Sequence, residues 1–304
     1  MNDTLHVAPE VRTALDAGRA VVALESTIIT HGMPHPRNLE TARAVEAAVR
    51  KEGAVPATIA VVDGRPHVGL SDDQLNDLSQ DSDVMKLSRG DLAFAVAMGR
   101  TGSTTVAATM ILAAAAGVGV FATGGIGGVH RGAEQDFDIS ADLQELARTP
   151  VLVVCAGAKA ILDVPKTLEV LETLGVPVIG HGTDVMPAFW SRSSAHPVPL
   201  RLDDAASIAR HERARRALGL TGGTLVANPV PEADEIHAEE LETVIAASVE
   251  EARVGGVAGK AVTPWLLNRV LERTGGKSLK TNIALVKHNA RLAARIATAM
   301  TQSG

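Results

Sequence analysis

The chain has 304 residues, of which 46% are hydrophobic and 21% charged, so it is long and apolar enough to bury a substantial core. Its net charge of −6 at pH 7 provides no general positive field for a nucleic-acid backbone, and its two Trp, four Phe and no Tyr leave few rings for stacking bases. We therefore expect a small-molecule substrate and no nucleic-acid partner. A small anion such as a phosphate is still compatible with this composition, because individual basic side chains and backbone N–H groups can bind one.

The single cysteine, Cys155, cannot form an internal disulfide, and the polar N-terminus has no signal-peptide pattern. We expect a cytoplasmic protein in which Cys155 is a small buried residue at the end of an apolar run. Residues 101–129 contain no charged residue, but Gly117 and Gly119 interrupt them. This pattern predicts a buried helix, a break and a buried strand rather than a membrane span, so no membrane partner is expected.

Strand and helix patterns alternate along the chain, with turn and capping residues between them. In the first part of the chain we predict a strand over Ala20–Leu24, a helix over Asn38–Glu52, a strand over Ala57–Val62 ending in an Asp63-Gly64 turn, and a helix from Ser71 with Gln74 completing a capping box. In the middle we predict a helix capped by Ser103 or Thr104 and ending at Ala116, a strand over Val118–Thr123, a helix over Asp142–Arg148, a strand over Val151–Cys155, a helix from Pro165 to Leu174 and a strand over Pro177–Ile179. The last part is predicted to form a helix over Asp203–Leu218, a strand over Thr224–Ala227, and closing helices over Ala238–Val254, Pro264–Arg273 and Ser278–Met300. The alternation predicts an α/β fold with three layers, α/β/α, in which helices cover both faces of a central, mostly parallel or mixed sheet.

Ligands in such folds bind beyond the carboxyl ends of the strands. Three polar segments follow predicted strands in this sequence, namely Glu25, Thr123 with the glycines at 124–128, and the segment 157–159 that ends in a lysine. The glycines lack the G-x-G-x-x-G spacing and no complete P-loop occurs, so neither a dinucleotide site nor a P-loop is predicted. The glycines either form a tight turn or let the backbone approach a ligand closely.

Two lysines and one glutamate carry the chemical signal. Lys159 ends a buried strand, where desolvation disfavours the ammonium form, and a neutral amine can attack a carbonyl carbon to form a Schiff base. The alternative is an ordinary solvated lysine. Glu25 stands in apolar sequence and either caps a neighbouring group or performs acid–base chemistry with a raised pKa. Lys86 taken alone is typical of a surface residue or a phosphate contact.

Three carboxylates, Asp136, Asp138 and Asp142, lie close together in the sequence. Such a cluster suits a hard cation such as Mg²⁺ or Mn²⁺ that retains several waters. The same run also fits the start of a helix, with Ser140 or Asp138 as the cap and acidic residues favoured by the helix dipole. The ten histidines show no zinc-binding spacing, although His31 and His130 lie beside candidate site segments.

Long strings of the sequence resemble the pseudouridine-5′-phosphate glycosidases, also called the indigoidine synthase A-like family. The resemblance rests on Ala23-Leu-Glu-Ser-Thr-Ile-Ile-Thr-His-Gly-Met-Pro-His-Pro36, Lys86-Leu-Ser-Arg-Gly-Asp-Leu92, Thr123-Gly-Gly-Ile-Gly-Gly-Val-His-Arg-Gly132, Asp136-Phe-Asp-Ile-Ser-Ala-Asp-Leu143, Cys155-Ala-Gly-Ala-Lys-Ala-Ile-Leu-Asp163, Pro187-Ala-Phe-Trp-Ser-Arg-Ser-Ser194, Asn228-Pro-Val-Pro231 and Thr274-Gly-Gly-Lys-Ser-Leu-Lys-Thr-Asn-Ile-Ala-Leu-Val286. Because these strings span nearly the whole chain, the resemblance implies a single domain over residues 1–304.

The family's residue roles are expected at the matching positions. The resemblance implies that Glu25 is the proton donor, that Lys159 is the Schiff-base nucleophile, and that Asp138 is the ligand of a divalent metal usually taken as Mn²⁺. It implies substrate binding by Lys86, Val106, Ser140, Ala141 and Asp142. From their neighbourhood we add Thr105, Thr123, His130 and Asn282 as phosphate or ribose contacts. The family also implies a homotrimer.

The activity implied by the resemblance is reversible cleavage of the carbon–carbon glycosidic bond of pseudouridine 5′-phosphate to uracil and ribose 5-phosphate through a lysine Schiff base. Two other enzymes remain open at this point. A metal-dependent N-glycosidic nucleoside or nucleotide hydrolase would form no lysine adduct, and a Schiff-base aldolase acting on a sugar phosphate would use Lys159 but ignore uracil. A sugar-phosphate-binding regulator would bind a ligand without turnover.

Overall fold

The computed structural model describes residues 4–257, 259 and 262–302, and its main feature is one mixed sheet. In these residues the sheet has eleven strands, with the order β1-β4-β3-β2-β7-β9-β13-β11-β12 and with β5 and β6 added beside β3. Pairing is parallel throughout except where β3 meets β4 and β6. The strands are β1 His6–Val7, β2 Val21–Leu24, β3 Val55–Val62, β4 Arg65–Val68, β5 Met85–Leu87, β6 Gly102–Thr104, β7 Val120–Ala122, β9 Leu152–Cys155, β11 Val178–His181, β12 Leu200–Leu202 and β13 Thr224–Ala227, and a separate pair joins β8 Val129–His130 to β10 Leu162–Asp163.

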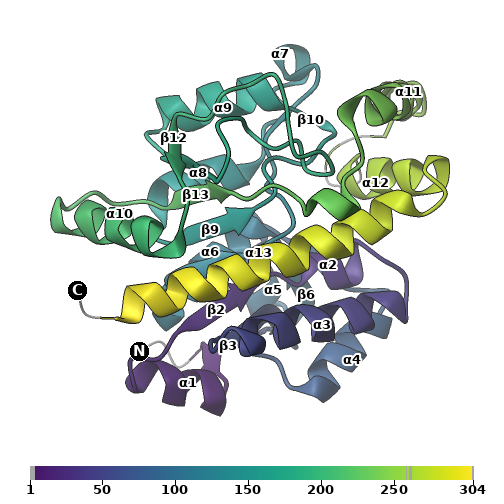
Figure 1. Cartoon of the computed structure of the whole chain (residues 1–304). Coiled ribbons are helices and arrows are strands. Elements are labelled where there is room, and N and C mark those ends of the chain that lie inside the picture. The colour runs from purple at the N-terminus through teal and green to yellow at the C-terminus, as the bar shows by residue number, and fades with distance from the viewer. Residues whose placement is uncertain (1–3, 258, 260–261, 303–304) are drawn as a thin grey trace.

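Helices cover both faces of this sheet. Figure 1 shows α13 crossing in front of the central strands with α3 and α10 beside it, and α6 and α8 behind. The helices are α1 Pro9–Asp16, α2 Thr27–Thr30, α3 Arg37–Lys51, α4 Asp72–Gln80, α5 Leu92–Ala97, α6 Val106–Ala116, α7 Ala133–Asp136, α8 Ala141–Arg148, α9 Val164–Thr173, α10 Ala205–Ala217, α11 Ala238–Val254, α12 Val262–Arg273 and α13 Lys277–Thr301, with short 3₁₀ helices η1 Arg89–Asp91 and η2 Glu232–Asp234. The predicted three-layer α/β/α fold with a mostly parallel sheet is confirmed.

The start of α6 differs from the prediction. Ser103 and Thr104 were expected to cap this helix, but residues 102–104 form β6, which pairs with β3 and β5. The residue before the helix is Thr105, whose side chain makes no capping hydrogen bond. By contrast, the capping box of α4 is present as predicted, because Ser71 Oγ accepts from the Gln74 backbone and Gln74 Oε1 accepts from the Ser71 backbone.

The charge-free stretch over residues 101–129 is resolved into β6, α6, β7 and the glycine run. Gly117 ends α6 with a φ of +87°, a left-handed conformation that glycine adopts without strain. In the part of the chain that the structure describes, no helix combines the length and the apolarity needed to cross a bilayer.

Helix α13 is fastened to the sheet by a buried asparagine. Asn289 is fully buried, and its Nδ2 donates to the backbone oxygen of Thr123 at 2.8 Å, just beyond the end of β7. Its Oδ1 accepts from Asn228 Nδ2 at 2.9 Å, and Asn228 follows β13. Because buried polar groups are costly when unpaired, these bonds fix α13 over the carboxyl ends of two strands.

We predict that Asn289→Ala lowers the free energy of unfolding by about 2–4 kcal/mol, because the Thr123 carbonyl and the Asn228 amide each lose a buried partner. Urea unfolding followed by circular dichroism measures the change. Asn268→Ala is the control, since Asn268 is exposed and bonds only Glu272 among the described residues. Equal stability of the two variants would contradict the role given to Asn289.

Candidate active site

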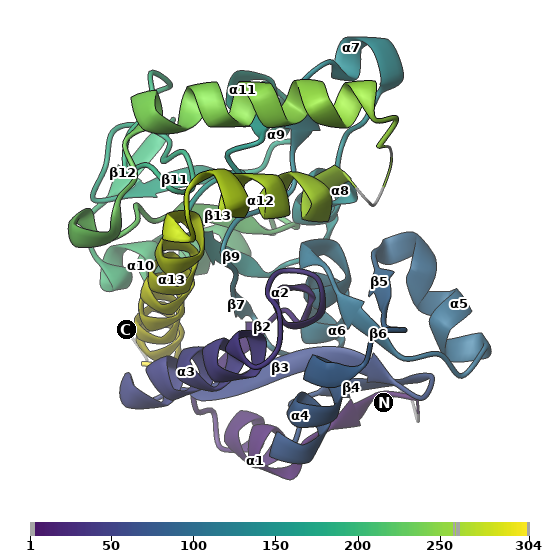
Figure 2. The same ribbon diagram turned by 90° about the vertical axis from the view of Figure 1, so that its right-hand side faces the viewer.

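Two neighbouring cavities lie at the carboxyl ends of β2, β7 and β9, the edge of the sheet around which α2, α6 and α12 are arranged (Figure 2). The narrow cavity has a volume of about 60 Å³ and the wide cavity about 280 Å³. Both are lined by Glu25, Thr27, Lys86, Lys159 and Thr263. The two predicted catalytic residues and Lys86 therefore meet at the boundary between the cavities.

Glu25 follows β2, and its half-buried carboxyl faces both cavities. The Thr123 hydroxyl, which comes from the end of β7, donates to Glu25 Oε1. Burial raises the pKa of Glu25 above its ordinary value of 4.5, against the opposing effects of the Lys159 charge and the Thr123 hydrogen bond. A carboxyl group with a raised pKa is suited to hold and deliver a proton.

Lys159 is positioned by a tight turn after β9. Its backbone N–H donates to the Ile126 oxygen at 3.1 Å, so the lysine segment and the glycine run lie side by side. Gly157 within this turn has a φ of +89°, and a Cβ there would lie 2.3 Å from the Pro187 oxygen. Only glycine fits this position, and the turn brings the half-buried Lys159 side chain to the cavities.

The wide cavity contains the N-terminal end of α6. Thr105 and Val106 line it, and the hydroxyl oxygen of Thr105 is buried with no hydrogen-bond partner in the described part of the chain. A helix N-terminus carries unpaired N–H groups and a positive partial charge, which together favour an anion. With Lys86 on the same wall, this end of the cavity is suited to a phosphate.

Asp142 braces the wide cavity from inside the protein. Its carboxylate is 5% exposed, with Oδ1 accepting from the Ala107 N–H at 2.9 Å and Oδ2 from the Gly127 N–H at 2.8 Å. Ser140 caps α8 by accepting from the Asp142 backbone, as the sequence predicted. A Cβ at Gly127 would lie 2.2 Å from Ser140 Oγ, so this glycine is required by packing against a side chain. Asp142 therefore joins α6 to the glycine run.

The expected cluster of three aspartates does not form. Asp136 accepts from the Asp138 backbone at 2.9 Å, and Asp142 is engaged by backbone amides. Within the described residues, no group of three or more His, Cys, Asp or Glu side chains is arranged to hold a metal. The remaining candidate metal ligands are Asp138 and His130, which both line the wide cavity, with Asp138 Oδ2 3.9 Å from His130 Nδ1. Burial lowers the pKa of His130, and the charge of Asp138 opposes this shift. One carboxylate and one imidazole fit a cation that takes its other ligands from water and substrate.

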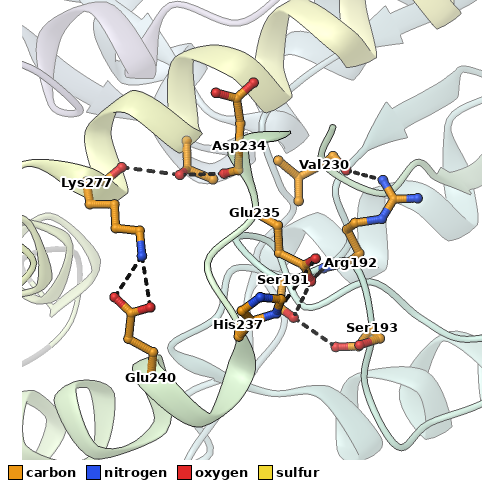
Figure 3. A network of polar contacts seen from close by, with 10 residues as sticks. Ser191, Arg192, Ser193, Val230, Asp234, Glu235, His237, Glu240 and Lys277 are labelled. Carbon is orange, nitrogen blue, oxygen red and sulfur yellow. Dashed lines mark hydrogen bonds and ion pairs between the residues drawn. The ribbon is translucent and has the colours of Figure 1, made fainter. Parts of the chain in front are cut away.

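The loop at 188–194 contributes one side chain to the narrow cavity. Phe189 lines it, and Trp190 Nε1 donates to Asn282 Oδ1 at 3.0 Å. Figure 3 shows how the loop is held, with Glu235 accepting from Ser191 Oγ and from the backbone N–H of Arg192. Asn282 is thereby fixed with its amide at the cavity.

The structure brings most of the predicted site residues together. The two cavities are lined by Glu25, Lys86, Thr105, Val106, His130, Asp138, Ser140, Asp142, Lys159 and Asn282. Thr123 is fully buried with its hydroxyl on Glu25, and Ala141 is exposed at the start of α8, so neither lines these cavities. Sequence reasoning missed Thr27, Ser88, Phe189, Leu267 and Thr263, of which Thr27 and Ser88 stand two positions after Glu25 and Lys86.

Comparison with known proteins agrees with this geometry. Residues 10–299 match the family model described as indigoidine synthase A like protein. The chain belongs to the indigoidine synthase A-like family. Relatives in this family include the pseudouridine-5′-phosphate glycosidase of Methylobacterium nodulans, which is 67% identical over 97% of this chain and 88% of its own, and that of Jannaschia sp., which is 64% identical over 98% of each.

Two solved structures share the fold of this chain. The prealnumycin C-glycosynthase AlnA, solved in complex with ribulose 5-phosphate, is 40% identical, with a TM-score of 0.92 over 99% of this chain and 98% of its own. The indigoidine synthase A-like protein of Thermotoga maritima is 33% identical, with a TM-score of 0.90 over 99% of each chain.

We predict that Glu25→Gln changes how stability depends on pH. The folded protein keeps the Glu25 proton at pH values where the unfolded chain has lost it, so the wild-type free energy of unfolding falls as the pH rises from 4.5 to the raised pKa. The amide introduced by the substitution has no proton to lose. The variant's stability relative to wild type should stay constant below that range and rise within it by up to about 1.4 kcal/mol per pH unit.

Urea unfolding of both proteins over a pH series measures this difference. Burial also raises the pKa of Glu46, but this group is present in both proteins and cancels in the comparison. A difference that stays flat across the series would mean that the Glu25 carboxyl is ordinary.

Proposed function

We propose that this chain reversibly cleaves the carbon–carbon glycosidic bond of pseudouridine 5′-phosphate to uracil and ribose 5-phosphate through a Schiff base on Lys159. One observation carries the proposal: Glu25 and Lys159 lie together at the boundary of two cavities, one suited to an anion and one narrow. The relatives named pseudouridine-5′-phosphate glycosidase and the C-glycosynthase complex with ribulose 5-phosphate support the same chemistry.

The sugar phosphate occupies the wide cavity in this proposal. Its phosphate lies at the N-terminal end of α6, where the unpartnered Thr105 hydroxyl and the Lys86 ammonium contact it. The base then occupies the narrow cavity, between Phe189 and the amide of Asn282. The scissile bond between base and sugar is thereby placed at the cavity boundary, next to Glu25 and Lys159.

A covalent lysine solves the chemical difficulty of this bond, because carbon is a poor leaving atom in a simple hydrolysis. Glu25 gives its proton to the ring oxygen of ribose as the ring opens, and the Lys159 amine bonds to C1′. When C5 of uracil accepts a proton, the bond from C1′ to C5 breaks and the amine's electron pair forms the imine. Water hydrolyses the imine to ribose 5-phosphate and free Lys159. The reverse sequence builds the nucleotide.

Asp138 and His130 are the residues that would hold a divalent metal, with Mn²⁺ as the proposed ion. A hard cation with several waters is compatible with one carboxylate and one imidazole, and when bound it supplies positive charge and ordered water to the phosphate end of the cavity. Asp138 and His130 line the wide cavity together with Lys86 and Thr105, the proposed phosphate contacts. The homotrimer implied by the family resemblance and the cytoplasmic location expected from the single cysteine and the polar N-terminus also stay predictions.

Borohydride trapping tests the covalent step. We expect protein reduced in the presence of ribose 5-phosphate to carry a ribose-phosphate adduct on the peptide that contains Lys159, because the imine becomes a stable amine. Peptide mapping by mass spectrometry locates the adduct. Lys159→Ala should carry none, whereas Lys166→Ala, which removes a lysine paired with Glu134 and Asp163, should be labelled like the wild type.

An active Lys159→Ala protein without adduct would overturn the Schiff-base route and favour a hydrolase that uses metal-bound water. An adduct without any C-nucleotide formed from uracil would favour an aldolase instead.

Metal dependence is tested at Asp138. We expect chelation to reduce turnover and Mn²⁺ to restore it in the wild type, while Asp138→Asn should need about 10–100-fold more Mn²⁺ for half-maximal activity because a charged ligand is lost. Asp136→Asn is the matched control, since this carboxylate accepts from the backbone of Asp138. Equal Mn²⁺ requirements in the two variants would remove Asp138 from the metal site.

A further inference from the structure

The proposed reaction needs a second proton carrier on the base side of the site. Glu25 serves the ribose oxygen, but the base must also lose a proton from N1 as the ring opens and gain one at C5 as the bond breaks. The narrow cavity has four titratable side chains among its described lining residues, namely Glu25, Lys86, Lys159 and His31. Of these, His31 is the one absent from the lining of the wide cavity, so it lies on the base side of the boundary, where it also lines a neighbouring cavity of about 310 Å³.

His31 is held by a directed chain of hydroxyl groups. Its Nδ1 lies 2.6 Å from Thr30 Oγ1, and Thr30 Oγ1 donates its hydrogen to Ser103 Oγ at 2.7 Å. Because the Thr30 hydrogen is already committed, its oxygen must accept the hydrogen of Nδ1. Ser103 is fully buried in β6, which anchors the chain in the sheet.

This hydrogen-bond order selects one form of the imidazole. With a hydrogen on Nδ1, the neutral ring has its lone pair on Nε2, and that nitrogen has no hydrogen bond to the residues that the structure describes. Burial, and after it the Lys86 charge, holds the pKa of His31 below its ordinary value of 6.5. At neutral pH the side chain is therefore a base with its free nitrogen available to a ligand.

We propose that His31 is the catalytic residue that moves the proton on the base, taking it from N1 and delivering it to C5. This assignment rests on the proposed function and adds the residue that serves uracil. The Asn282 amide lines the same cavity and holds the base in register, with its oxygen already bound to Trp190 and its NH₂ group left for a carbonyl of the base.

The proton and electron movements balance through the whole cycle. Nε2 of His31 takes the N1 proton, the pair released forms a double bond from C5 to C1′, and the bond from C1′ to the ring oxygen breaks as that oxygen takes the proton of Glu25. The Lys159 amine adds to C1′, returns the pair to the base and gives a proton back to Glu25. His31 then protonates C5, and the bond from C1′ to C5 breaks as the imine forms. Uracil leaves as the N1 anion and is protonated when water hydrolyses the imine.

The His31→Asn variant tests this role, because it keeps a hydrogen-bonding atom near the Nδ1 position and lacks Nε2. Two measurements on it separate the reaction at the sugar from the reaction at the base. We expect wild-type levels of borohydride-trapped ribose 5-phosphate on Lys159, because imine formation with the sugar involves no base. We expect uracil release from pseudouridine 5′-phosphate to fall by about 10²–10⁴-fold, the usual contribution of a positioned acid–base group. Exchange of deuterium from C5 of labelled uracil, in the presence of ribose 5-phosphate, should fall equally.

His31→Gln places an amide near the Nε2 position without a group that can carry a proton, so it should fail in the same way. His67→Asn is the matched control, because His67 is also half-buried with a pKa lowered by burial, and it packs against His6 outside the two cavities. Unchanged uracil release in His31→Asn would overturn the assignment. A folded His31→Asn protein in which ribose 5-phosphate trapping falls as much as uracil release would overturn it too. A wild-type protein that releases no uracil would instead overturn the proposed function.

Discussion

The site depends on one half-buried carboxyl group that lines the same two cavities as two lysines. Glu25 faces the narrow and the wide cavity rather than bulk water. Burial raises its pKa and outweighs the Lys159 charge, which lowers it. Strand β2 positions Glu25, but the neighbouring strands supply the side chains around its carboxyl group. Thr123 comes from the end of β7 and Lys159 from the turn after β9, so the parallel order of these three strands is what assembles the centre.

Two buried polar side chains then hold the strand ends in register. Asn289 binds the backbone at Thr123 from the α13 side of the sheet, and Asp142 binds the backbone at Gly127 from the α8 side. The glycine run is therefore fixed at both ends, by Asn289, which also binds Asn228, and by Asp142, which also binds the Ala107 N–H and lines the wide cavity. A fully paired buried polar group adds only modest net stability, but it fixes the positions of the groups that it binds. A catalytic site depends on such fixed positions.

Periodicity and strand-end polarity were enough to predict the layered fold and the meeting of Glu25, Thr123 and Lys159, because parallel strands end at one edge. The same patterns gave a wrong prediction at Ser103, which was expected to cap a helix but lies in β6 and pairs with β3. Pairing with a distant strand leaves no signal in the local sequence. For the three aspartates the sequence left a metal cluster and a helix start open, and the tertiary structure favours the helix start, because Ser140 caps α8 and Asp142 binds backbone amides from other segments. The roles of Lys86, Val106 and Asp138 came from family resemblance and could not be derived from spacing.

Beyond the residues that they share, the two cavities are built from different parts of the chain, which under the proposed function separates the requirements for the sugar from those for the base. Thr263 at the start of α12 lines both cavities, but the wide cavity alone uses α6, the turn before α8 and the segment at 130–138, and the narrow cavity alone uses α13, the loop at Phe189 and the turn at His31. Under the proposed function, a substitution at a residue that lines only the narrow cavity, such as Phe189, would change the room for the base and leave the phosphate contacts in place. The C-glycosynthase AlnA, at 40% identity, was solved with a sugar phosphate, ribulose 5-phosphate. Under the proposed function, changes confined to the narrow cavity would alter the partner joined to the sugar while the lysine and glutamate at the boundary stay in place.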